Sequence, residues 1–190
     1  MAAKRKTTKK LDKKKKKKWY SIHAPSSFGG AELGESYVAA PENIIGKRIR
    51  VNLSNVSKTR NQNVRIKFQV TGVNEEKGIT EPVSYEMLAN HINRVVRKNK
   101  SKIDSSLKLK TKDKAEVTVK AIIITRTKVK GGVLTAVKKE AVNLIEEQVK
   151  NSPFSKLLDS IIAYDFQKAL KHSLKKITPI QTVEIKFFGK

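Results

Sequence analysis

The chain has 190 residues, of which 42 are Lys or Arg and 17 are Asp or Glu, so its formal net charge is +25. So large an excess of one charge disfavours a compact free protein, and a polyanionic partner is the simplest explanation for it. The length fits one domain with extensions or two small domains. The absence of cysteine excludes a disulfide scaffold, thiolate catalysis and a thiolate zinc site.

Residues 1–45 are predicted to form an N-terminal extension. Residues 1–18 contain 11 basic side chains and one acid, and a segment with this charge repels itself and stays extended. A Trp-Tyr pair and a stretch rich in Gly, Ser and Pro follow, without periodicity. No apolar region comes after the basic start, as a secretory signal requires, and the aliphatic run at 121–124 is too short to span a bilayer. We therefore expect a disordered basic extension and no membrane partner.

Two strands are predicted after residue 46. Ile49 and Val51 alternate with polar or basic residues, and apolar and polar residues alternate in the same way from Val64 to Val70. We expect these strands to form an antiparallel pair with one apolar face and one face lined by Arg and Lys.

The remaining elements indicate an α+β fold. A helix is predicted from Tyr85 to about Lys98, capped by Ser84 and basic at its end. A strand at 107–110 precedes a central strand at 115–128, whose middle is apolar on both faces. Helices are expected at 131–150 and from Pro153 past Leu170, before a last strand at 183–187. Residues 46–190 should thus form one domain of mostly antiparallel strands covered by about three α-helices.

No pattern in the chain indicates an enzyme. The three histidines are dispersed, with no partner at metal-ligand spacing. The acidic pairs at 146–147 and 159/165 fall on solvent-facing helix positions. Neither glycine pair continues into the Gly-Lys-Ser/Thr ending of a phosphate-binding loop. We predict no catalytic residues, no metal, no cofactor and no small-molecule substrate.

Basic residues recur on several predicted elements, which favours RNA as the polyanion. Lysine dominates over arginine, as suits neutralisation of a phosphate backbone and recognition of folded RNA by shape. Affinity should then depend steeply on salt. Two alternatives stay open for Trp19 and Tyr20, which could stack on exposed bases or dock against the protein core. The residues that we predict to contact RNA are Lys9, Lys10, Lys13, Lys14, Lys15, Lys16, Lys17, Lys18, Trp19, Tyr20, Lys47, Arg48, Arg50, Lys58, Arg60, Arg65, Lys67, Arg94, Arg97, Lys98, Lys100, Arg126, Lys128 and Lys130.

The stretch KKWYSIHAPSSF resembles the N-terminal signature of the S-three-a family of archaeal and eukaryotic small-subunit ribosomal proteins. That signature has K-K-W-Y, three variable residues, A-P-S and a Phe, which fall here on Lys17–Tyr20, Ala24–Ser26 and Phe28. The resemblance continues in family order through IIGKRIRVNLSNV, VRIKFQVTGVNEEKG, KLKTKDKAEVTVKAIIITRTK and ITPIQTVEIKFF. It therefore covers nearly the whole chain beyond the lysine run.

The resemblance implies a structural component of the small ribosomal subunit in the cytoplasm, with a barrel-like antiparallel core. Its partners would be small-subunit ribosomal RNA and neighbouring ribosomal proteins. The family would lie on the platform near the messenger RNA exit, close to where initiation factors dock. The chain ends soon after Phe188, whereas eukaryotic members continue into a longer tail, so an archaeal member is expected.

The alternative from another class is a free RNA chaperone or single-stranded RNA-binding module that acts transiently. Such proteins usually display several aromatic rings on a sheet face. The strands predicted here offer Arg, Lys and Gln outward instead, which favours the ribosomal component.

Overall fold

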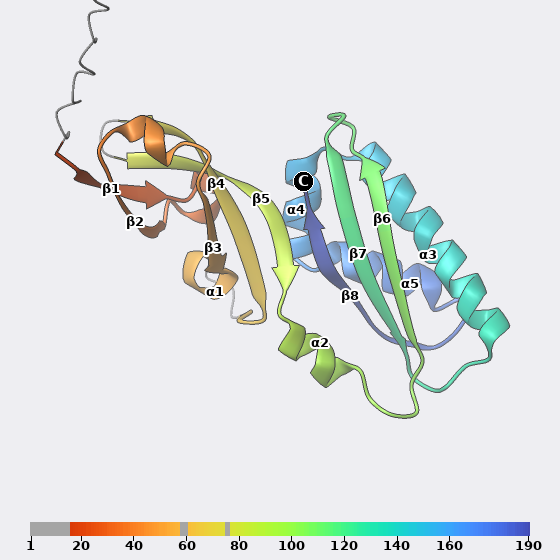
Figure 1. Ribbon diagram of the computed structural model, residues 1–190. Helices are drawn as coiled ribbons and strands as arrows, with labels where there is room; N and C mark the ends of the chain where they lie inside the picture. Colours follow the sequence, from red (N-terminus) through yellow and green to blue (C-terminus); the bar gives the residue numbers. More distant parts are fainter. Residues whose placement is uncertain (1–15, 58–60, 75–76) are drawn as a thin grey trace, which may run out of the picture.

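The computed structural model describes residues 16–57, 61–74 and 77–190 (Figure 1). The strands in this part of the chain are β1 (Lys18–His23), β2 (Glu32–Val38), β3 (Arg48–Asn52), β4 (Val64–Asn74), β5 (Lys77–Met87), β6 (Lys102–Lys110), β7 (Glu116–Thr125) and β8 (Ile180–Gly189). The α-helices are α1 (Leu53–Val56), α2 (Ala89–Val95), α3 (Gly131–Asn151), α4 (Phe154–Ile162) and α5 (Asp165–Leu174). No helix among these residues is long and apolar enough to cross a membrane.

The eight strands belong to one sheet whose centre is β5. Along the path β2-β1-β5-β8-β7-β6, neighbouring strands are hydrogen-bonded, and β4 pairs with both β3 and β5. The β1–β5 pairing is parallel, and the other pairings are antiparallel. The predicted α+β class with mostly antiparallel strands is therefore confirmed. The sheet is open, so the barrel-like closure is not confirmed, and the described residues form five α-helices where about three were predicted.

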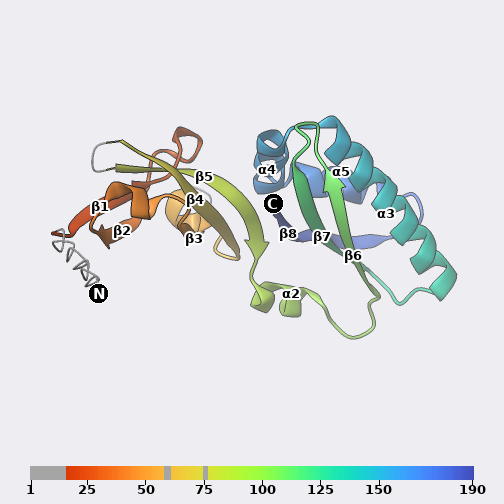
Figure 2. The same cartoon turned by 45° about the horizontal axis from the view of Figure 1, so that its top comes forward.

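The strand β5 joins two parts of the molecule (Figure 2). It pairs with β4 along its length, with β1 near its start, and with β8 only through residues 84–86. β5 and β8 come close at Gly189, where an added Cβ would lie 2.3 Å from Ser84 Cβ. A side chain at residue 189 would thus force the two strands apart.

The predicted strand pair after residue 46 is confirmed as β3 and β4. Ile49 lies opposite Phe68, and Val51 lies opposite Ile66. Phe68 and Ile66 are fully buried in the main core. Because successive side chains of a strand alternate between its faces, the basic residues between these positions project to the other face.

The helix predicted from Tyr85 to about Lys98 is wrong in its first half. β5 continues to Met87, and the helix α2 spans only Ala89–Val95. Tyr85 pairs with Ile66 on one side and with Phe188 on the other. Strand pairing on both sides, with nearly complete burial of Tyr85, outweighs the helical spacing of the local apolar residues.

In the C-terminal part, α3, α4 and α5 cover one face of β6, β7 and β8 (Figure 1). Val117 and Val119 of β7 share the main core with Val137 and Ala141 of α3. The predicted central strand with an apolar middle is confirmed, since residues 121–125 are all buried. The strand β7 connects the turn after β6 with the loop before α3.

The helix predicted to run from Pro153 past Leu170 is two helices, α4 and α5. The break falls at Tyr164, which has φ of 70°, a left-handed conformation that a helix interior does not allow. The Tyr164 hydroxyl donates a hydrogen bond to Oε1 of Glu184 in β8, at 2.5 Å. Burial raises the pKa of the Glu184 carboxyl, although the Tyr164 hydrogen bond and the charges of His91 and Lys171 oppose this rise. The polar contact to β8 thus compensates for the break.

The segment described from residue 16 to residue 45 is ordered. It contains the hairpin β1–β2, and the buried side chains of Tyr20, Ile22 and Val38 form a second small core with Ile44 and Val70. The disorder predicted for residues 16–36 is wrong, because their apolar residues alternate along β1 and β2, which pair with each other, and β1 also pairs with β5. The prediction of a disordered lysine tail at 1–15 lies outside the described residues, and the boundary at 45/46 stays a prediction.

Candidate nucleic-acid interface

The first basic surface is the outer face of β3 and β4, here named the ribbon face and made of Arg48, Arg50, Arg65 and Lys67. Arg50 lies directly opposite Lys67, and like charges in such positions repel. Arg48 donates a hydrogen bond from Nε to Gln69 Oε1 at 3.2 Å. The apolar residues of both strands hold this face outward, so its charges are arranged for an anion outside the protein.

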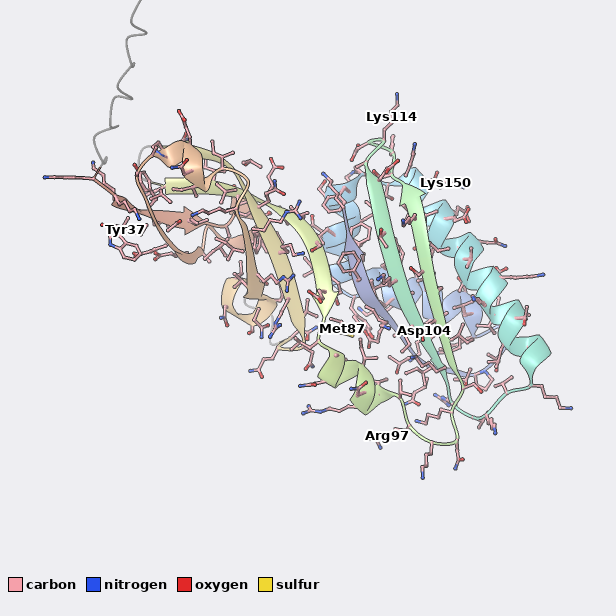
Figure 3. All side chains as sticks on the ribbon, in the orientation of Figure 1. Tyr37, Met87, Arg97, Asp104, Lys114 and Lys150 are labelled. Carbon is pink, nitrogen blue, oxygen red and sulfur yellow. The ribbon has the colours of Figure 1, made fainter. Side chains whose placement is uncertain are left out.

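The second surface, named the basic end, gathers two segments that are distant in sequence. It combines the last turn of α2 and the residues after it with the loop between β7 and α3, and Figure 3 shows Arg97 at this end. Ser101 fixes the two segments together, because its hydroxyl accepts the Val129 N–H at 3.0 Å and its carbonyl accepts the Thr125 N–H at 3.0 Å. The predicted contact residues in the basic end are Arg94, Arg97, Lys98, Lys100, Arg126, Lys128 and Lys130.

Six of these seven side chains are exposed. The exception is Lys100, which is half-buried and donates a hydrogen bond to the Gln181 side chain of β8. Arg97 donates from Nε to the Arg94 carbonyl oxygen at 3.4 Å. The remaining cations project from two backbone segments that Ser101 joins, so the basic end presents its positive charges to solvent.

A third surface was missed by the sequence-based prediction. The face of β6, β7 and β8 opposite the helices carries Lys102, Lys108, Lys110, Lys120 and Lys186. Asp104 forms ion pairs with Lys102 at 2.7 Å and Lys186 at 3.8 Å, which reduces the local excess of charge. The alternation of Lys108 and Lys110 with leucines was visible in the sequence, but only the β6–β7 register places Lys120 on the same face as these lysines.

Lys190 lies between the first and third surfaces. It lines one pocket with Arg48, Gln69 and Glu81, and another with Lys108. Its Nζ is 4.7 Å from the centre of the Phe154 ring, so the side chain is held against α4. The ribbon face and the lysines of β6 are thereby linked into one extended basic region.

The two residues of the Trp-Tyr pair have different environments. Tyr20 is 8% exposed and lies in the second core, which favours the alternative in which its ring docks against the protein. Its contact with RNA stays a prediction. Trp19 is 61% exposed. Lys16, Lys17 and Lys18 beside it are exposed, as is Lys47, whose Nζ donates to the Ser36 hydroxyl at 2.8 Å. The other predicted contact residues, Lys9, Lys10, Lys13, Lys14, Lys15, Lys58 and Arg60, lie outside the described residues.

The described residues contain no group of three or more His, Cys, Asp or Glu side chains that could hold a metal ion. Both ring nitrogens of His23 have hydrogen-bond partners within the protein: Nε2 lies 3.1 Å from the Ser21 hydroxyl, and Nδ1 lies 3.4 Å from the Gly30 carbonyl oxygen. The exposed Lys and Arg side chains of these surfaces can neutralise and position a polyanion.

Comparisons with known proteins identify the family of the chain. A protein of Haloquadratum walsbyi, named small ribosomal subunit protein eS1, is 28% identical over 170 residues, which are 89% of this chain and 80% of the relative. Proteins with the same name from Methanoculleus marisnigri and Methanococcus maripaludis are 27% and 28% identical, over 97% and 90% of this chain and 94% and 76% of their own lengths. The profile of the Ribosomal S3Ae family matches residues 5–187. The resemblance inferred from the signature is confirmed, and the chain belongs to the ribosomal S3Ae family.

Proposed function

We propose that this protein is a structural component of the small ribosomal subunit that binds small-subunit ribosomal RNA through its phosphate backbone and shape. Its relatives in Haloquadratum walsbyi and Methanoculleus marisnigri are named as small-subunit proteins. Family membership confirms the prediction that the chain is not an enzyme, and it agrees with a place on the cytoplasmic ribosome beside other ribosomal proteins.

The observation that carries the RNA-binding proposal is the basic end. Two segments separated by the strands β6 and β7 carry seven cations, and the hydrogen bonds of Ser101 join the two segments. Lysines and arginines that contact phosphates displace counterions without reading base edges. The ribbon face and the lysines of β6–β8 project from other parts of the protein, which suits folded RNA that contacts it from several sides.

Sedimentation tests the proposal. The tagged protein is followed in lysate of its own cells, first at low and then at moderately high salt. We expect stoichiometric migration with small subunits at both concentrations, because many phosphate contacts and protein neighbours act together in an assembled particle. Migration in light fractions, or complete release at modest salt, would instead support the transient RNA chaperone.

We further propose that the protein supports the platform near the messenger RNA exit, close to messenger RNA and to initiation factors. This finer placement rests on the family resemblance. The chain has no cysteine, so one introduced thiol can carry a hydroxyl-radical probe. We expect Lys98→Cys, in the basic end, to cleave platform RNA, and Glu147→Cys, exposed on α3, to cleave little RNA. Cleavage of RNA in another region of the subunit from Lys98→Cys would contradict the placement.

A further inference from the structure

Trp19 and Tyr37 form a pair of exposed aromatic rings on the hairpin β1–β2. They are direct cross-strand partners, their ring centres are 4.9 Å apart, and the rings are inclined by 36°. Trp19 is 61% exposed and Tyr37 is 50% exposed. Half or more of each residue therefore remains open to a further partner, and Figure 3 shows Tyr37 at the outer edge of the molecule.

The hairpin holds these rings in place from behind. Alternation along the strands puts Tyr20, Ile22 and Val38 into the second core and leaves Trp19 and Tyr37 on the opposite face. β1 is also bonded to β5, and the Thr80 hydroxyl of β5 donates to the His23 carbonyl oxygen at 2.8 Å. The hairpin that carries the aromatic pair is thus joined to the central strand of the sheet.

The charges around the pair differ at its two ends. At one end Lys17 places Nζ 5.7 Å from the centre of the Tyr37 ring, and Lys16 is exposed beside it. At the other end Ser21 lies opposite the exposed Glu35. A phosphate would be attracted to the lysine end and repelled by Glu35, whereas Glu35 and Ser21 can accept hydrogen bonds from a base.

We propose that Trp19 and Tyr37 form a stacking platform for an unpaired RNA base, with Lys17 neutralising the adjoining phosphate. This inference rests on the proposed function, since it names one class of RNA element that the protein binds. Bases inside a duplex are already stacked on their neighbours, so only an unpaired base can use the platform. Aromatic rings beside lysines bind single-stranded RNA by combining stacking with charge neutralisation.

The sole tryptophan of the chain, Trp19, reports directly on this site. The full protein is titrated with a short single-stranded oligouridylate and, separately, with a blunt-ended two-strand RNA duplex that carries the same number of phosphates and no unpaired base. We expect saturable quenching of Trp19 emission by the single strand and little change with the duplex. Stacking of one base on an aromatic ring contributes to the affinity for single-stranded RNA. We therefore expect Tyr37→Ala to weaken single-strand binding about tenfold and to leave duplex binding unchanged.

Two further variants separate stacking from general loss of apolar surface. Trp19→Phe keeps an aromatic ring and should retain most of the single-strand affinity, measured by anisotropy of labelled RNA. Ile177→Ala removes an exposed apolar side chain, 41% exposed, from a distant site and should change nothing.

Three outcomes would overturn the inference. If both RNAs bind but Trp19 emission and the Tyr37→Ala affinity are unchanged, the platform is refuted and the proposed function stands. If neither RNA binds at low salt, the proposed function fails as well. If RNA never quenches Trp19, yet acrylamide cannot reach it in assembled subunits, a protein neighbour occupies the rings.

Discussion

Replacing Gly189 by Ala should loosen the junction between the two parts of the molecule. The new Cβ would lie 2.3 Å from Ser84 Cβ and 3.0 Å from the Val83 carbonyl oxygen. Carbon atoms prefer separations of about 3.5–4.0 Å. Because the nearest atoms belong to the backbone and to a Cβ rather than to a flexible side-chain end, β5 and β8 must separate by about an ångström.

The expected loss of stability follows from that displacement. Overpacking of a buried site typically destabilises a protein by about 1–3 kcal/mol. The β5–β8 pairing has only three residue pairs, so this separation also weakens backbone hydrogen bonds that contribute about 1 kcal/mol each. We expect Gly189→Ala to lower the free energy of unfolding by about 2–4 kcal/mol.

Urea denaturation followed by circular dichroism measures this loss. Gly72→Ala in β4 is the matched control, because no atom lies within 4 Å of its added Cβ, and it should change stability by less than about 0.5 kcal/mol. The double variant Ser84→Gly/Gly189→Ala removes the shortest contact and should recover part of the loss. A Gly189→Ala protein as stable as the wild type, or a double variant no better than the single one, would refute the steric argument.

The other predictions concern charge and backbone conformation. Burial raises the pKa of the Glu184 carboxyl in the folded state, so the folded protein binds the carboxyl proton more tightly than the unfolded chain does. The stability of the protein therefore falls as pH rises above about 4.3, the pKa of Glu in the unfolded chain. Glu184→Gln should therefore gain stability relative to the wild type as pH increases, which urea midpoints at a series of pH values will show, and a constant difference would contradict this expectation. Lys98→Ala combined with Lys128→Ala should reduce the salt slope of binding to a small-subunit RNA fragment by about two, whereas Lys156→Ala, exposed on α4, should leave it unchanged. Lys114 has a φ of 58°, which disfavours a side chain, so Lys114→Gly should raise the free energy of unfolding by about 0.5–1 kcal/mol and shift the urea midpoint upward. An unchanged midpoint would argue against backbone strain at this residue.

Local alternation was sufficient to predict the elements whose partners lie nearby. β3 has Val51 on its apolar face and Arg50 on its basic face, and β4 has Ile66 and Arg65 in the same roles. The pairing of the two strands follows from that pattern. The central strand β7 could be recognised because its middle is apolar on both faces. In these strands the local residues are sufficient to determine the secondary structure.

Elements that depend on distant residues were not predictable in this way. Tyr85 has helical spacing to its apolar neighbours, and only its pairing with Ile66 and Phe188 makes it part of a strand. The break at Tyr164 depends on a hydrogen bond to Glu184, twenty residues further along the chain. The sequence pattern of one segment gives no information on these distant partners.

The same limit applies to the candidate site. The basic residues were identified by type, but the basic end exists because Ser101 joins two separate segments. Tyr37 entered no prediction of RNA contacts, since only the β1–β2 register places it opposite Trp19. Composition could indicate a polyanionic partner, whereas the grouping of contacts required the fold.

The three partners of β5 have a consequence for the order of folding during synthesis. Its pairing with β4 and β1 uses only residues made before position 88, so this half of the sheet can form early. Its pairing with β8 uses residues 187–189 and closes a long loop through the whole C-terminal part. Contacts of such sequence separation form slowly. Until β8 emerges from the synthesising ribosome, the end of β5 is an unpaired strand edge, which can associate with other chains unless RNA or a chaperone covers it.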